Sequence, residues 1–167
     1  MNLKVNRNYI FICIIVIAGL LLAISYTAAT EQNRGYRQNY NNFAQAIQLM
    51  NQQKYAEAQE ILNLLDQDSR QTYQALYVQA ICSAKTGDYA SAAAFMQQVR
   101  EAHPAFLMDQ QYLEQYGEIL YRLGDYDRAR LYLSESLKYP NNTLLTKSAQ
   151  NSLTEIEKLQ RERSKNK

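Results

Sequence analysis

Few residues of this chain have the types and spacing that catalysis or metal binding requires. The chain has one histidine, His103, and two cysteines, Cys13 and Cys82. His103 precedes Pro104 and is expected in a loop. Cys82 follows Ile81 in an apolar pattern, where cysteine usually behaves as a small buried hydrophobe. The sequence has neither a glycine-rich phosphate loop nor histidines and cysteines at metal-ligand spacing. We therefore predict that the protein is not an enzyme and holds no metal or cofactor.

Tyrosines and a pair of acids are better candidates, and their chemistry is that of recognition. The chain contains 14 tyrosines and no tryptophan. Tyrosine combines a large contact area with a polar tip and is enriched at protein interfaces. Glu114 and Glu118 are four residues apart, a spacing that puts both carboxylates on one face of a helix. These residues need a scaffold that presents them together.

A short phrase that repeats along the chain indicates what that scaffold is. The phrase reads QKYAEA from Gln53, GDYASA from Gly87 and GDYDRA from Gly124, so the intervals are 34 and 37 residues. A period near 34, with a turn between two helical patterns, is typical of arrays of helical hairpins. Such units bury their apolar faces by stacking on one another. We predict an all-α solenoid of three helix-turn-helix repeats.

Apolar residues spaced by three and four set the repeat boundaries. The repeats are predicted over residues 39–72, 73–109 and 110–142. A last helical pattern has no second helix after it, and terminal capping elements are expected in solenoids. Residues 143–167 are therefore predicted to form a capping helix and a charged tail that frays beyond Glu157.

Glycine, aspartate and proline mark the turns of the second repeat. Gly87 stands where a left-handed residue ends a helix, and Asp88 can cap the next one through its side chain. Pro104 stops that helix because proline cannot continue the hydrogen-bond ladder. The three extra residues before the third repeat are assigned to a loop at 105–107.

The spacing of large and small residues resembles the tetratricopeptide repeat family over about residues 39–142. The second repeat departs from the family pattern at Gln79 and Ser83, where apolar residues are usual. The first repeat departs at Asn42 and Gln45. The third repeat matches best, through Leu113, Tyr116, Gly117, Leu120, Ala129, Leu133 and the nearby Pro140.

This resemblance implies that the first helix of each pair lines a concave groove that binds a protein or peptide. An extended peptide or amphipathic helix, with a basic end that meets Glu114 and Glu118, is the expected ligand. Packing between helices is the alternative for Tyr77 and Tyr121, and core packing is favoured for Phe43 and Ile47. The predicted groove residues are Tyr40, Gln74, Tyr77, Gln111, Glu114, Gln115, Glu118 and Tyr121.

The N-terminal part has a different composition. Residues 9–29 form an uncharged run of 21 residues, and a transmembrane helix needs roughly 20. We predict a transmembrane helix or signal anchor there, after a short tail at residues 1–8 and before a polar linker at residues 30–38. Cleavage as a signal peptide is the alternative, and it would release a secreted binding module.

Charge suggests the orientation of that segment. Lys4 and Arg7 precede the run without an acid, which favours a cytoplasmic N-terminus and extracytoplasmic repeats. Repeats in the cytoplasm, acting as a docking adaptor, are the alternative. The spacing of Gly19 and Ala23 would allow weak self-association of the segment. Without Lys4 and Arg7 the chain has 16 basic and 16 acidic residues, so no basic stripe points to nucleic acid.

The function predicted from these features is a membrane-anchored scaffold that binds a protein or peptide partner. The order of anchor, linker, repeats and cap is similar to bacterial single-pass tetratricopeptide proteins that act in envelope assembly or secretion. An enzyme or carbohydrate site in the tyrosine-rich groove is a third interpretation.

Overall fold

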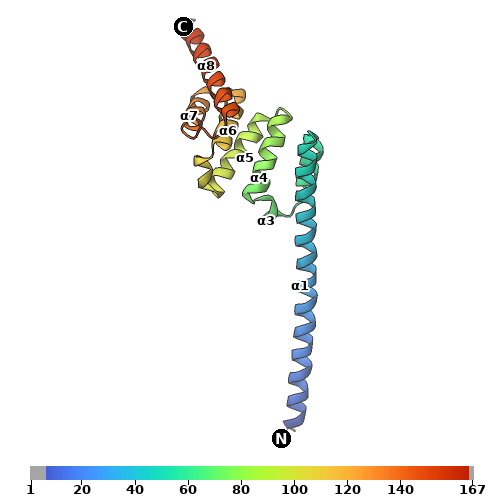
Figure 1. The fold of residues 1–167 in the computed structure, drawn as a ribbon. Helices are drawn as coiled ribbons and strands as arrows, with labels where there is room; N and C mark the ends of the chain where they lie inside the picture. The colour runs from blue at the N-terminus through green and yellow to red at the C-terminus, as the bar shows by residue number, and fades with distance from the viewer. Residues whose placement is uncertain (1–6, 166–167) are drawn as a thin grey trace. The chain divides into compact units, whose positions relative to one another are not determined.

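The computed structural model describes the backbone of residues 7–165 and the side chains of residues 16–27 and 29–164. Over these residues the protein is all-helical, without a β-strand, as the sequence predicts (Figure 1). The predicted tail at residues 1–8 lies almost wholly outside the described part. The helices are α1 (Arg7–Asn51), α2 (Tyr55–Leu62), α3 (Gln67–Arg70), α4 (Tyr73–Lys85), α5 (Tyr89–Ala102), the 3₁₀-helix η1 (Pro104–Met108), α6 (Gln110–Leu123), α7 (Tyr126–Ser136) and α8 (Thr143–Lys165).

The chain divides into two units, Met1–Asn41 and Asn42–Lys167. The first consists of the longer part of α1. Residues 30–38, which the sequence suggested as a linker, are helical instead. Their Glu, Gln and Arg residues are good helix formers, and the single Gly35 costs only about 1 kcal/mol relative to alanine. A polar composition therefore did not interrupt the helix.

The membrane-spanning segment predicted at residues 9–29 is not supported by the described residues, which leave out the side chains of residues 9–15 and 28. Among the residues that the structure describes, no helix has a stretch that is both long and apolar enough to cross a bilayer. Such a stretch requires about 20 apolar residues.

The second unit is built from antiparallel helix pairs that follow one another along the chain. α4 packs on α5 and α6 packs on α7, and α8 contacts both helices of the last pair (Figure 1). The turns within the two complete pairs use Gly87 and Gly124, whose φ angles are 91° and 86°. Asp88 then accepts the backbone N–H of Ser91 at 3.0 Å and caps α5. The repeated Gly-Asp phrase is thus a helix stop followed by a helix start.

Small residues let the paired helices approach closely. Ala80 and Ala92 are fully buried between α4 and α5, and Ala129 is buried where α7 meets α6. At Gly117 a Cβ would lie 2.6 Å from Cγ of Leu133, so only glycine fits there without a shift. A second core joins α2 to α4 around Leu62 and Cys82.

α8 ends the stack with one solvated face. Its buried side includes Ala149 and Ile156. On the opposite side of α8, each residue lies 34 positions after a residue of α6 that packs on α7. That side of α8 is polar and exposed, and its residues are Lys147, Gln150, Asn151 and Thr154.

The charged end of α8 is ordered as helix to Lys165, whereas the sequence predicted fraying beyond Glu157. The guanidinium carbon of Arg163 lies 4.9 Å from the ring centre of Tyr126. Gln160 donates a hydrogen bond to Asp127 at 3.4 Å. These contacts with the start of α7 explain why the helix continues.

Candidate functional site

Four aromatic rings line an open pocket between the end of α1, the start of α4 and η1. Its volume is about 230 Å³, and no charged side chain lines it. Phe106 of η1 contributes one wall, so the short helix after Pro104 carries a ring into the site. We call this the aromatic pocket; its lining residues are Phe43, Ile47, Tyr73, Gln74, Tyr77, Val78 and Phe106.

The rings around Phe106 are packed against one another in defined orientations. Tyr77 stacks on Phe106 with ring centres 5.9 Å apart and planes inclined by 8°. Tyr73 meets the same ring edge-on at 5.7 Å. His103, which the sequence placed in a loop, lies against Tyr73 at 4.7 Å and Phe106 at 5.3 Å. Such offset and edge-on pairs stabilise by about 0.5–1.5 kcal/mol beyond area burial, so the wall is held in place.

Tyr77 is the residue that links the pocket to α6. Its hydroxyl donates a hydrogen bond to Oε1 of Gln115, and its side chain is half-buried. Burial raises the pKa of Tyr77 to about 12, and the carboxylates of Asp109 and Glu114 act in the same direction. Tyr77 therefore stays a neutral donor at physiological pH, in a negative local field.

A second open hollow, of about 270 Å³, lies between α4 and α6. Gln115, the hydrogen-bond partner of Tyr77, lines it, so the aromatic pocket and this hollow adjoin. We call the two together the groove. The second hollow is lined by Ile81, Ala84, Lys85, Glu114, Gln115, Glu118 and Ile119.

Both acids of the predicted groove already have partners within the chain. Glu114 is only 6% exposed and accepts a hydrogen bond from the Ser148 hydroxyl of α8. Glu118 accepts from the Ser152 hydroxyl at 2.8 Å and pairs with Arg122 at 2.8 Å. These contacts give the two carboxylates a structural role at the α6–α8 interface. That role was not visible in the sequence.

Gln110 adds a third polar contact to the same interface. It is 2% exposed, and its Nε2 donates to the Thr146 hydroxyl at 2.9 Å. Its Oε1 accepts the backbone N–H of Asn142 at 2.7 Å. Gln110, Glu114 and Glu118 are one helical turn apart, so polar contacts run along α6 where it meets the capping helix.

Glu114→Gln is expected to make the protein's stability less dependent on pH. Burial raises the pKa of Glu114 above its usual range; the Ser148 hydroxyl opposes this shift, Glu118 adds to it, and Lys85 opposes it. Because the folded-state pKa is raised, the protonated form favours folding, and this contribution is lost as pH rises through the folded-state pKa. Glutamine is neutral at every pH and still offers an acceptor to Ser148.

Urea unfolding between pH 4 and pH 8 measures this effect. The free energy of unfolding of the Gln variant minus that of the wild type should increase with pH. Glu60→Gln, on the exposed face of α2, controls for the loss of one surface charge. A difference that decreases with rising pH would show that the fold stabilises the Glu114 carboxylate.

The other predicted groove residues lie in several environments. Gln74 lines the aromatic pocket and is exposed, and Gln111 is exposed on α6. Tyr121 is half-buried against Tyr126, with ring centres 6.0 Å apart. Tyr40 is 74% exposed and belongs to the first unit. Their roles in binding stay predictions.

Phe43 and Ile47, for which the sequence favoured core packing, are half-buried and line the aromatic pocket while packing on the α2–α4 core. Phe106 and Tyr73 were missed as site residues. The signal for Phe106 was the three-residue excess before the third repeat, because an insertion next to a proline is a place where a ring can be added to a groove.

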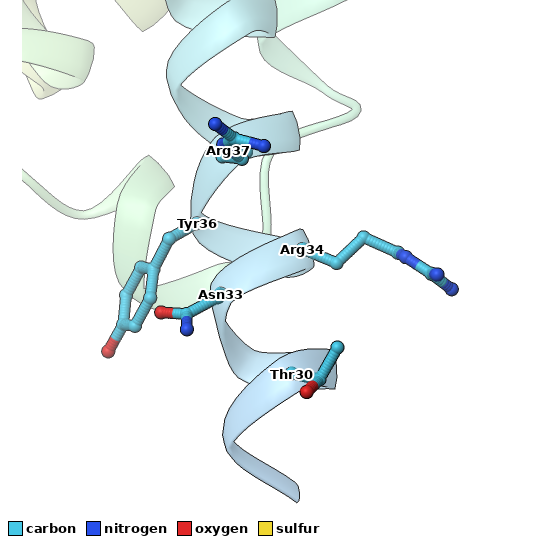
Figure 2. Close-up of a pocket in the computed structure, with 5 residues that line it drawn as sticks. All are labelled: Thr30, Asn33, Arg34, Tyr36 and Arg37. Carbon is cyan, nitrogen blue, oxygen red and sulfur yellow. The ribbon is translucent and has the colours of Figure 1, made fainter. Parts of the chain in front are cut away.

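A further hollow lies on α1 alone, in the first unit. Figure 2 shows its side chains projecting from a single helix in different directions. Arg34 pairs there with Glu31 at 3.5 Å, and both side chains are more than two-thirds exposed. Nothing within that unit faces these residues, so the hollow lacks the opposed walls of a ligand site. It is lined by Thr30, Asn33, Arg34, Tyr36 and Arg37.

The structure also shows the environment of Cys82 and of the possible metal ligands. Cys82 is fully buried, and burial raises the pKa of its thiol to about 11. A thiol in this state is a poor nucleophile and a poor metal ligand. Among the described residues, no group of three or more His, Cys, Asp or Glu side chains could hold a metal ion.

The paired helices, the Gly-Asp turns and the groove along the first helices define an α-helical repeat protein. A model of the tetratricopeptide repeat family matches residues 43–105. The match covers most of the first two predicted repeats.

The chain is also similar to a solved structure, the NMR structure of the second TPR domain of the human RPAP3 protein in complex with the HSP70 peptide SGPTIEEVD. The TM-score is 0.59 and the sequence identity 16%, with 74% of this chain and 98% of that domain covered. At this identity the similarity concerns the fold. No curated protein matches the chain.

Proposed function

We propose that the protein is a scaffold whose groove binds a peptide segment of a protein partner. The observation that carries this proposal is the aromatic pocket: four rings in an open, uncharged site formed by the end of α1, the start of α4 and η1. Buried rings with polar tips are the side chains that most often dominate binding energy at interfaces.

The similar human domain supports this proposal, since it was solved with a peptide bound. That peptide ends in Glu-Glu-Val-Asp. In this chain, Asp109, Glu114 and Glu118 lie along the groove helix α6, and carboxylates there would repel an acidic ligand. The proposed partner segment therefore differs in charge from the peptide of the human domain.

Blocking the groove is expected to abolish peptide binding without harming the fold. Gln74 is exposed and lines the aromatic pocket, so Gln74→Trp would fill the pocket with a large ring while leaving the core untouched. Peptides selected from a random display library on the full chain should bind this variant at least about tenfold more weakly, a loss typical of a contact at the centre of an interface.

The matched control is Gln98→Trp, which adds the same ring at an exposed position of α5. It should bind the selected peptides like the wild type. Failure to select any peptide, or equal binding by the two variants, would refute the groove as the binding site.

A further inference from the structure

The aromatic pocket is lined by four rings, and aromatic rings are side chains that attract cations. Phe43, Tyr73, Tyr77 and Phe106 line it together, and Phe106 meets one neighbour face-to-face and another edge-on. The face of an aromatic ring carries negative potential, and a Lys or Arg head within about 6 Å of a ring centre is attracted to it.

Negative charge near the pocket is not balanced by a lining cation. Asp109 and Glu114 both act on the Tyr77 hydroxyl as negative charges. Neither forms an ion pair with another residue of the described part of the chain. Lys85 lines the neighbouring hollow, and the aromatic pocket itself is lined by no charged residue.

The rest of the pocket suits the stem of a long basic side chain. Ile47 and Val78 supply apolar surface, on which a methylene chain can pack. Gln74, the polar lining residue, is exposed. Asp109 is exposed as well and is fixed in place, because its Oδ1 caps α6 by accepting the Tyr112 N–H at 2.7 Å.

We propose that the aromatic pocket takes a basic side chain, arginine or lysine, of the peptide that binds in the groove. The stem packs on the aliphatic residues, and the charged head lies against the rings on the side of Asp109. This inference rests on the proposed peptide-binding function and specifies its ligand. It also moves the basic contact away from Glu114 and Glu118, whose carboxylates bind α8.

The direct test uses small probes and the full chain. Backbone amide shifts are followed by NMR during titration with N-acetyl-arginine amide, and separately with N-acetyl-norleucine amide, whose side chain is an uncharged aliphatic chain. The arginine probe should give saturable shifts confined to residues 43–47, 73–78 and 106, with at least about threefold higher affinity than norleucine. Equal or tighter binding of norleucine, or no binding of either probe, would overturn the proposal.

Asp109→Asn tests whether the Asp109 carboxylate contributes to binding of the charged head. Asparagine is as good an N-cap as aspartate, so α6 keeps its cap while the charge is lost. Affinity for the arginine probe should fall about two- to fivefold and lose part of its salt dependence. Asp68→Asn, on the short helix α3, is the matched control and should leave the affinity unchanged. Unchanged affinity of Asp109→Asn for the arginine probe would show that Asp109 is not part of the site.

The display selection described above separates the two proposals. Selected peptides without a basic residue, or enriched in an apolar anchor, would refute the basic side chain and leave peptide binding intact. A chain that binds the arginine probe but selects no peptide would refute peptide binding and leave the cation site.

Discussion

Replacing Leu133 with alanine is expected to lower the free energy of unfolding by about 2–5 kcal/mol. Leu133 lies on α7, is fully buried, and packs at the closest approach of α7 to α6. Truncation removes its buried methyl groups and leaves a cavity that the flanking helices cannot fill, because Gly117 opposite has no side chain. Urea unfolding followed by circular dichroism gives the value.

Leu131→Ala is the matched control for this prediction. It makes the same substitution on the same helix, at a side chain that is 64% exposed. Its effect should stay within about 0.5 kcal/mol. Similar losses for the two variants would show that the α6–α7 interface is not packed as described.

Gly117→Ala is expected to destabilise the same interface by about 1–3 kcal/mol, as overpacking does. The new Cβ would lie 2.6 Å and 2.8 Å from Cγ and Cδ2 of Leu133, and 3.1 Å from its backbone nitrogen. In an open helix the same change would stabilise by up to about 1 kcal/mol, so it is the clash with Leu133 that makes the change destabilising here. Gly35→Ala, where nothing lies within 4 Å of the new Cβ, is the control and should cause no loss.

Combining Gly117→Ala with Leu133→Ala tests whether the two substitutions affect stability through the same contact. When Leu133 is alanine, Cγ and Cδ2 are gone, and the cost of Gly117→Ala should shrink by at least about 0.5 kcal/mol. Strict additivity of the two losses would contradict the contact between Gly117 and Leu133.

The repeated phrase predicted the turns of this fold well because its physics is local. A glycine with positive φ and an aspartate that caps the next helix need only their immediate neighbours. Gly87 and Gly124 have that conformation, Asp88 caps α5 as expected, and Asp125 caps α7 in the same way. The all-helical class followed from the same period.

The composition of the groove was harder to predict because it depends on contacts between distant residues. The burial of Glu114 and its contact with Ser148 connect residues 34 positions apart. The place of Phe106 depends on how η1 packs on α4 and α6. The Glu114 contact has no local signature, and the only signal for Phe106 is the three-residue excess before the third repeat. The sequence therefore suggested the acids as ligand contacts and left Phe106 in a loop.

The polar interface between α6 and α8 has a consequence for the groove. Gln110, Glu114 and Glu118 hold the capping helix through side-chain hydrogen bonds. Such bonds require defined geometry, so they fix the position of α8 along α6 more strictly than apolar contacts would. The end of the groove is thereby fixed together with the cap.

Site-specific photo-crosslinking in cells that produce the protein tests the binding groove most directly. A photoreactive phenylalanine analogue is placed at Gln74, in the aromatic pocket, and in a second variant at Ser134, exposed on α7. If the groove binds the partner, a protein adduct should form from position 74 and none from position 134. A display-selected peptide should compete with formation of the adduct at position 74. Adducts from position 134 alone, or adducts at 74 that the peptide does not displace, would contradict it.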